Sequence, residues 1–189
     1  MAKQQELIMC GRFFTDIGLS EWVSHSVGFD YQVEVSPDVR PTHSLACIIS
    51  DAGILQQRSL QWGIKPAWAN KLIINAQAET VATKPTFRGG FRFARCLIPC
   101  SGWYEWHEKQ KYSFNSPEPV LMAGIGLEGG RSVVILTTEA TGSCRDYHHR
   151  MPLIIPKHSM ISWLQADPET AAHLLSNYED HHLQVALSG

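Results

Sequence analysis

The chain has 189 residues, a formal net charge of −2 and 44% hydrophobic residues, which suits one globular domain with one sizeable core. A near-neutral chain is not held on nucleic acid by its overall charge, so any such binding would need a local basic groove. No apolar run reaches the roughly 18–20 residues of a membrane helix, and Met1–Met9 lacks the charged-then-apolar plan of a signal peptide, so we expect a cytoplasmic protein.

Short apolar segments punctuated by glycine and proline predict strands in the middle of the chain and helices towards its ends. The predicted strands are 45–50, 55–62, 71–75, 95–99, 120–125 and 133–137. The predicted helices are 20–27, 157–165 and 167–177, the last with Asp167 as N-cap and Pro168 at its first position. This order predicts an α+β fold with a mainly antiparallel sheet, and residues 179–182 are expected to be a solvated tail.

The five cysteines are scattered along the chain and are expected to be reduced thiols. Cys96 and Cys100 lie close enough in sequence to suggest a metal site. However, no second close pair of cysteine or histidine ligands completes it, and Cys96 lies in an apolar run. We interpret both as buried core thiols and predict neither a metal nor another cofactor.

Reactive side chains are concentrated in four otherwise apolar segments, namely 9–13, 75–80, 102–106 and 148–152. Taken singly, each has an ordinary structural explanation. A lone cysteine is usually a small buried hydrophobe, an asparagine after a strand is often a turn former, and a glutamate or a histidine pair can simply face water.

Taken together, the segments supply a thiol nucleophile at Cys10, a side-chain amide at Asn75, a carboxylic acid at Glu105 and an imidazole at His148. Glu105 stands between two aromatic residues, whose burial would disfavour the charged carboxylate and suit proton transfer. Histidine titrates near neutral pH, and an amide can hold a substrate oxygen without changing charge. The set suits carbonyl chemistry.

The same segments, in the same order, resemble the signature of the SRAP family (SOS-response-associated peptidase). The matching motifs are Cys-Gly-Arg-Phe after a methionine at 9–13, Trp-Gly through Pro-Ala-Trp at 62–68, Asn-Ala-x-x-Glu-Thr at 75–80, the run 95–106 ending in Gly-Trp-Tyr-Glu-Trp, Leu-Thr-Thr-Glu-Ala at 136–140 and His-x-Arg-Met-Pro at 148–152. The resemblance runs from Met9 to about Pro156. It implies one SRAP-type domain at 9–178 with a barrel-like sheet and a few flanking helices, in a bacterial or phage protein.

The resemblance also implies an activity, which is covalent attachment to abasic sites in single-stranded DNA during the response to DNA damage. In the family a terminal cysteine uses its α-amine to form a Schiff base with the open-chain sugar aldehyde, and its thiol then closes a thiazolidine ring. By position, Cys10 would supply both groups. Glu105 and His148 would transfer protons, and Asn75 would hold the sugar or the reacting centre.

Contacts to single-stranded DNA are implied for Arg12, which matches a phosphate-contacting arginine, and for Trp68, which matches an aromatic that packs against bases. Gln77 stands where many members carry a phosphate-contacting arginine, so its contact is expected to be weaker. Arg88 lies in a basic stretch, 86–95, that could extend the groove together with Arg92 and Arg95. The alternatives are a core aromatic for Trp68 and a solvated face for the arginines.

The main departure from the family is that Cys10 is internal in the chain as written, because an internal cysteine has no free α-amine. Residues 1–8 are therefore interpreted as an extension, either from a mis-assigned start upstream of Met9, which we favour, or removed by self-processing. The third explanation is a member that uses the thiol alone or acts differently. A further departure is Asp-Val-Arg-Pro-Thr at 38–42, where the family often has Asn-Ile-Ala-Pro-Thr; the turn there is expected to persist.

Two other functions remain open from the sequence. A cysteine peptidase would use the same Cys10, Glu105 and His148 but cleave other proteins. A non-covalent single-strand-binding module would retain DNA affinity without Cys10. Residues 179–189 are expected to lie outside the domain as a tail, and a monomer is expected because crosslinking needs one site.

Overall fold

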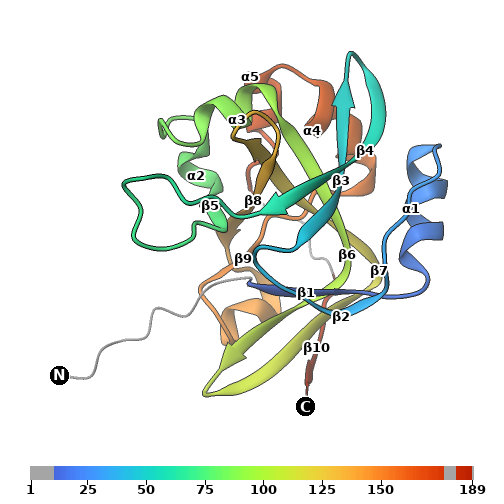
Figure 1. Cartoon of the computed structure of the whole chain (residues 1–189). Helices are drawn as coiled ribbons and strands as arrows, with labels where there is room; N and C mark the ends of the chain where they lie inside the picture. The colour runs from blue at the N-terminus through green and yellow to red at the C-terminus, as the bar shows by residue number, and fades with distance from the viewer. Residues whose placement is uncertain (1–10, 177–181, 189) are drawn as a thin grey trace.

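A ten-stranded, mainly antiparallel sheet forms the body of the protein, with short helices packed against it (Figure 1). The computed structural model describes residues 11–176 and 182–188. In these residues the strands are β1 (Arg12–Thr15), β2 (Ser36–Val39), β3 (Ser44–Asp51), β4 (Ile54–Trp62), β5 (Asn75–Gln77), β6 (Arg95–His107), β7 (Gln110–Leu127), β8 (Ser132–Glu139), β9 (Arg150–Pro152) and β10 (Gln184–Leu187). The helices are α1 (Leu19–Val27), α2 (Ala78–Val81), α3 (Arg88–Phe93), α4 (Met160–Gln165) and α5 (Pro168–Ala172), with 3-10 turns η1 (Gly142–Asp146) and η2 (Lys157–Ser159).

Five of the strands close into a ring, in the order β6–β7–β8–β4–β3 and back to β6. The junction of β4 and β8 is a short parallel pairing, Gln61 with Ser132 and Trp62 with Val133. Closure removes the exposed edges that an open sheet would present. The α+β class and the barrel-like, mainly antiparallel core predicted from the sequence are confirmed.

Strand alternation divides the hydrophobic residues between two cores on opposite faces of this sheet. Along β6, Cys96, Ile98 and Cys100 face one core, while Leu97 between them faces the other. The buried side chains of the α-helices all belong to the core with Leu97, so the core with the cysteines is the interior of the ring. Cys96 and Cys100 are therefore buried core thiols, as the apolar run indicated.

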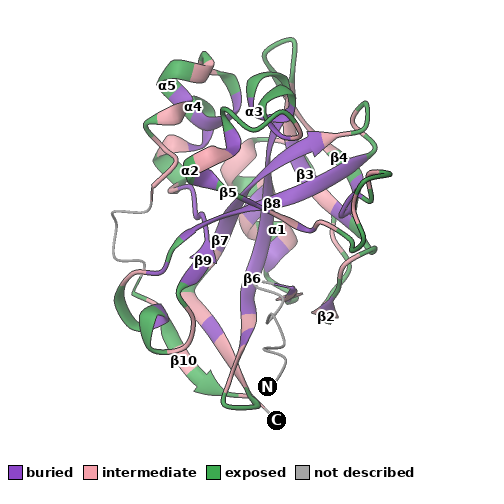
Figure 2. Ribbon diagram, turned by 90° about the vertical axis from the view of Figure 1, so that its left-hand side faces the viewer, coloured by how far each residue is buried: buried purple, intermediate pink, exposed green. Residues whose placement is uncertain are grey.

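The interior of the ring is tightly filled. Gly124 on β7 leaves space there, because an added Cβ would lie 2.4 Å from the Cδ1 of Ile98. Strands bordering both cores are buried on both faces, whereas the β6–β7 hairpin becomes more exposed towards its tip (Figure 2).

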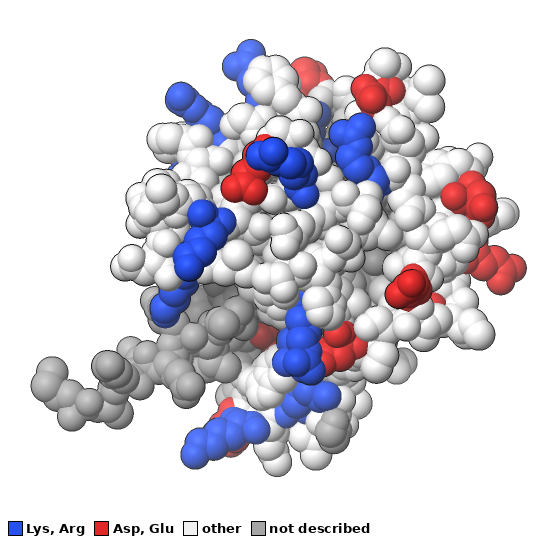
Figure 3. All heavy atoms as spheres, viewed as in Figure 1, with Lys and Arg blue, Asp and Glu red and all other residues white. Residues whose placement is uncertain are grey.

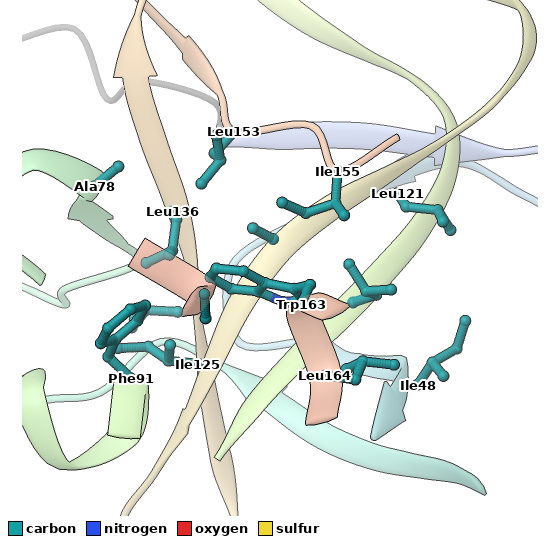
Figure 4. Close-up of a cluster of buried hydrophobic side chains, with 14 of the residues drawn as sticks. Ile48, Ala78, Phe91, Leu121, Ile125, Leu136, Leu153, Ile155, Trp163 and Leu164 are labelled. Atoms are coloured by element: carbon teal, nitrogen blue, oxygen red, sulfur yellow. The ribbon is translucent and has the colours of Figure 1, made fainter. Parts of the chain in front are cut away.

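The core with Leu97 lies outside the ring and is the outer core. Trp163 of α4 is central to it, where side chains from several strands and from α3 surround the indole (Figure 4). Its indole Nε1 donates to the carbonyl of Cys96 at 2.9 Å, so the buried polar atom is satisfied. Truncating such a side chain typically costs about 3–5 kcal/mol. No helix in the described residues is long and apolar enough to cross a membrane.

Several predicted boundaries differ from the structure. The strand expected at 71–75 is a loop up to Ile74, where Ile73 forms only an isolated bridge with Ile64, and β5 begins at Asn75. The helix expected at 167–177 ends at Ala172, although Asp167 caps it as predicted by accepting from the backbone N–H of Thr170 at 2.9 Å. Part of the expected C-terminal tail, Gln184–Leu187, pairs with β7 as β10.

Strands β6 and β7 both extend well beyond the predicted 95–99 and 120–125. β7 contains Pro117 and Pro119, and the β6–β7 pairing has an irregularity in register beside them, between Cys100 and Gly102 of β6. Beyond this irregularity the two strands pair again up to the hairpin turn. This extension places the segment 102–106 on a rigid strand.

Candidate functional site

Strand β8 joins two of the four sequence segments that carry reactive groups. On one side it pairs with β5, Asn75 opposite Ile135 and Gln77 opposite Thr137. On the other it pairs with β9, Glu139 opposite Arg150. Ala76 is buried, so alternation directs Asn75 and Gln77 to the opposite face from the core.

An ion pair that the sequence analysis left without a role holds these segments together. The buried guanidinium of Arg150 donates to both carboxylate oxygens of Glu79, at 2.7 and 2.8 Å, and to the carbonyl of Thr137 at 2.5 Å. The hydrogen bond from Arg150 is the main reason that the pKa of Glu79 lies below its usual value. Both residues lie in the motifs quoted above. The sequence signal for their pairing was two opposite charges, each inside an otherwise apolar segment.

His148 is half-buried at the end of η1. Its Nδ1 accepts the backbone N–H of Arg150 at 3.0 Å, and its own backbone N–H donates to the carbonyl of Cys144 at 3.0 Å. The ring stacks on His149 with centroids 4.4 Å apart. Burial lowers the pKa of His148 below its usual value, which favours the neutral imidazole needed for accepting a proton.

Glu105 lies on β6, opposite Tyr112 of β7, and is only 4% exposed, in line with the desolvation expected from its aromatic neighbours. Burial, followed by the negative charge of Glu105, raises the pKa of the Cys144 thiol to about 12. Since the carbonyl of Cys144 accepts from the backbone of His148, Glu105 and His148 border the same short segment. The structure thereby brings the third and fourth reactive segments into one neighbourhood.

Arg12 begins β1 opposite Tyr104, next to Glu105 in the sheet. Its guanidinium forms an ion pair with Asp38 and lies 5.6 Å from the ring centroid of Trp106. Asp38 also pairs with Arg40, and these hydrogen bonds, with Arg12 first, lower the pKa of Asp38 to about 2. The cluster of two arginines and one aspartate retains one positive charge.

The departure at 38–42 therefore has a structural explanation. Asp38 and Arg40, the two polar changes relative to the family pattern, are partners of each other at 2.7 Å. The expected turn is present, because the backbone N–H of His43 donates to the carbonyl of Arg40 at 3.1 Å. Cys10, two residues before Arg12, lies outside the described residues.

Three predicted binding and catalytic residues line one surface pocket of about 470 Å³. Trp68 is 68% exposed, so the interpretation as a core aromatic is wrong. Asn75 and Gln77 of β5 line the same pocket, together with Lys84, which the sequence analysis did not single out. An exposed indole beside amide and ammonium groups can hold an unpaired base and its phosphate.

The basic stretch 86–95 is divided by the fold. Arg88 and Arg92 are exposed on α3 and line a separate hollow of about 480 Å³. Arg95 is buried, and its guanidinium donates to the carbonyls of Phe91 at 2.8 Å and Trp163 at 2.6 Å. Arg95 is thus a structural residue, and its expected role in a groove is wrong.

Within residues 11–176 and 182–188, no group of three or more histidine, cysteine or acidic side chains is arranged to hold a metal ion. The groups that the fold brings together are a carboxylic acid, an imidazole, an amide and several guanidiniums. These groups can transfer protons and bind anions.

The sequence profile of the family described as "SOS response associated peptidase (SRAP)" matches residues 9–187. Abasic site processing protein YoqW from Bacillus subtilis is 30% identical over 198 residues, covering 90% of this chain and 88% of that protein. Abasic site processing protein YedK from Escherichia coli is 26% identical over 179 residues, covering 84% of this chain and 81% of that protein.

Solved structures share the fold. A phage-related protein from Bordetella bronchiseptica superposes with a TM-score of 0.79 at 22% identity, covering 95% of this chain and 94% of that one. A protein from Bacteroides thetaiotaomicron gives a TM-score of 0.70 at 23% identity, with coverage of 93% and 91%. At these identities the likeness concerns the fold alone.

Proposed function

Because its profile covers residues 9–187, the chain belongs to the SRAP family, and we propose that it processes abasic sites in single-stranded DNA. The observation that carries the proposal is its similarity to relatives such as YoqW, named an abasic site processing protein, which aligns with 90% of the chain. Two features of the site support it: Asn75 and the segment of His148 are joined through β8, and Glu105 and His148 both border the segment of Cys144.

In the proposed reaction Cys10 is the nucleophile. Its α-amine adds to the aldehyde of the ring-opened sugar and loses one water to give a Schiff base. The thiol then adds to the carbon–nitrogen double bond and closes a five-membered thiazolidine, with the thiol proton passing to the nitrogen. The α-amine must be free, so the peptide bond before Cys10 must first be absent or hydrolysed.

Chain geometry supports Cys10 in this role. β1 begins at Arg12, opposite Tyr104 and next to Glu105. Two peptide units limit the Cα separation of Cys10 and Arg12 to about 7 Å. Cys10 is thus covalently tethered close to Arg12, whose sheet partner Tyr104 directly precedes Glu105, which is consistent with the proposed role of Glu105.

Glu105 and His148 are proposed as the proton-transfer pair. Opening the sugar and losing water both need an acid, and ring closure needs a base. Glu105 is sequestered from water, and His148 is biased to its neutral form. Asn75, from the pocket that also contains Trp68, would hold a sugar oxygen without adding charge.

The strand itself is proposed to follow the basic and aromatic surface. Trp68 would stack on a base beside the lesion, Gln77 and Arg88 would contact phosphates, and the Arg12–Asp38–Arg40 cluster would offer its remaining positive charge to the backbone. These contacts read no base edges, so binding is expected to be independent of sequence.

The test uses a chain beginning at Met9 and a single-stranded oligonucleotide with one abasic site, analysed on a denaturing gel. We expect a covalent adduct that survives without a reducing agent, because a thiazolidine is stable where a Schiff base hydrolyses. In Cys10→Ser the amine remains and the thiol is lost, so the adduct should need borohydride for trapping. Should Cys10→Ser give the same stable adduct as the parent, the thiazolidine mechanism is wrong. Cleavage of added proteins without any adduct would favour the peptidase function.

A further inference from the structure

A second exposed aromatic side chain, which the proposed reaction does not use, lies on α3. Phe93 is 81% exposed, more than Trp68. The guanidinium of Arg92 lies 5.4 Å from the centroid of its ring. An exposed aromatic ring beside a cation is an arrangement on which single-stranded bases stack.

A row of basic side chains leads from the Trp68 pocket to Phe93. Lys84, Arg88 and Arg92 follow one another at intervals of four residues and are all exposed. The backbone N–H of Arg88 donates to the carbonyl of Lys84 at 2.9 Å, and α3 continues this helical spacing, so the three residues lie along one side. Figure 3 shows basic side chains along the left-hand edge of the molecule, over the loop before β5 and the segment of α2 and α3.

The row connects two hollows of the surface. Lys84 lines the pocket that contains Trp68, whereas Arg88, Arg92 and Phe93 line the neighbouring hollow. Helical geometry gives a span of about 12 Å from residue 84 to residue 92. A stacked strand rises about 3.4 Å per nucleotide, so the row matches three to four nucleotides.

Packing fixes the direction in which α3 presents these groups. Phe91 is buried in the outer core, directly before the exposed Arg92 and Phe93. Gly90 lets the helix approach β7 closely, because an added Cβ would lie 2.7 Å from the carbonyl oxygen of Gly126. A helix held this tightly supports its exposed face as a preformed surface.

We propose that Lys84, Arg88 and Arg92 bind the phosphates of the single strand flanking the abasic site, and that Phe93 stacks on a base several nucleotides from the lesion. This inference rests on the proposed function and adds a second stacking position to it. Charge complementarity favours DNA as the occupant, since two cations, Arg88 and Arg92, line a hollow with one acidic residue, Glu169, and Lys84 adds a third cation at the Trp68 pocket. The site makes affinity depend on the length of strand on one side of the lesion.

The test measures binding without crosslinking, using fluorescence anisotropy and oligonucleotides that carry a tetrahydrofuran abasic analogue, which has no aldehyde. The strands have one nucleotide on each side of the analogue, or are extended by six nucleotides on the 5′ side or the 3′ side. One extension is expected to raise affinity more than the other. Phe93→Ala should weaken binding of that longer strand about tenfold and leave the short strand unaffected, and Phe93→Tyr should restore it.

Charge variants test the phosphate contacts separately. Arg92→Ala should lower the slope of log affinity against log salt by about 0.7 for the extended strand, as expected for one lost phosphate contact. Lys109→Ala, in the turn of the β6–β7 hairpin far from α3 in Figure 1, removes the same charge and should leave the slope unchanged. Glu169→Gln should tighten binding of the extended strand.

Equal binding of the extended strand by Phe93→Ala and the parent would overturn the inference, and a protein partner for this face would then be the better explanation. The parent's reaction with an aldehyde-bearing short oligonucleotide is measured in parallel. If the adduct forms while Phe93→Ala has no effect, the inference fails and the proposed function stands. If no oligonucleotide binds and no adduct forms, both fail.

Discussion

The reacting side and the strand-binding side of the candidate site are built in different ways. Glu105 and Arg150 lie on strands and are buried, with their neighbours fixed by the sheet. Trp68 and Phe93 lie in a loop and on a short helix and are exposed. The difference separates the groups that need a fixed position and a dry environment from those that need only to be accessible, and it predicts different consequences of substitution.

The largest effect is expected on the reacting side. Glu105→Gln keeps the shape of the buried side chain but cannot exchange a proton, so the rate of adduct formation should fall by about 10²–10⁴-fold. Anisotropy with the tetrahydrofuran analogue should show unchanged affinity. A variant that reacts at the parental rate would remove Glu105 from the mechanism.

The ion pair between Arg150 of β9 and Glu79 of α2, which acts as a clamp between these elements, should stabilise the fold. Arg150→Met removes both bonds to Glu79 and leaves the buried carbonyl of Thr137 without this donor, which should reduce the free energy of unfolding by about 1–3 kcal/mol. Urea denaturation measures the change, with Arg131→Met on the exposed β7–β8 turn as the matched control. If both variants unfold at the same urea concentration as the parent, the clamp is not structural.

On the binding side, Trp68→Ala should weaken affinity for the tetrahydrofuran strand by roughly tenfold, the value of one stacked base. The melting temperature should stay at that of the parent, because the indole is exposed and contributes little to the core. A large loss of stability would indicate instead that Trp68 packs structurally, and the contrast between the two sides would weaken.

The contrast also explains which features could be predicted from the sequence. Alternation and turn residues identified the sheet, and the candidate reactive residues could be selected because they lie in motifs that local sequence displays. The clamp between Glu79 and Arg150 and the row from Lys84 to Arg92 were missed, because they depend on pairing across β8 and on the docking of α3. The burial of Arg95 was missed for the same reason, since its partner Trp163 is far away in sequence.

A smaller effect is expected from restoring the family residue on β5. Gln77→Arg adds a cation to the exposed end of the strand, in the pocket of Trp68. The slope of log affinity against log salt should become steeper by about 0.7, with no change in reaction rate once the protein is saturated. An unchanged slope would place the phosphate path away from β5.

The smallest effect concerns the cluster around Asp38. Its pKa of about 2 lies below the ordinary 3.8, so its ion pairs contribute stability that is complete above pH 3.8 and is lost as the pH falls towards 2. Asp38→Asn should therefore be slightly less stable than the parent at pH 7 and equal to it near pH 2, as followed by urea denaturation at each pH. At pH 7 the same variant should bind DNA more tightly, because Arg12 and Arg40 are released from their acidic partner. If the parent and Asp38→Asn have the same free energy of unfolding at every pH, the ion pairs of Asp38 contribute nothing to stability.

Covalent attachment through Cys10 is best tested by weighing the intact protein before and after it meets an abasic single-stranded oligonucleotide. Chains beginning at Met1 and at Met9 are compared, each with a Cys10→Ala counterpart. We predict that the Met9 chain loses its methionine and gains the mass of the oligonucleotide less one water, and that Cys10→Ala gains nothing. A Met1 chain that shortens to Cys10 and then reacts would establish self-processing. If the Met9 chain exposes Cys10 and its mass stays unchanged in the presence of the oligonucleotide, the covalent mechanism is wrong for this protein.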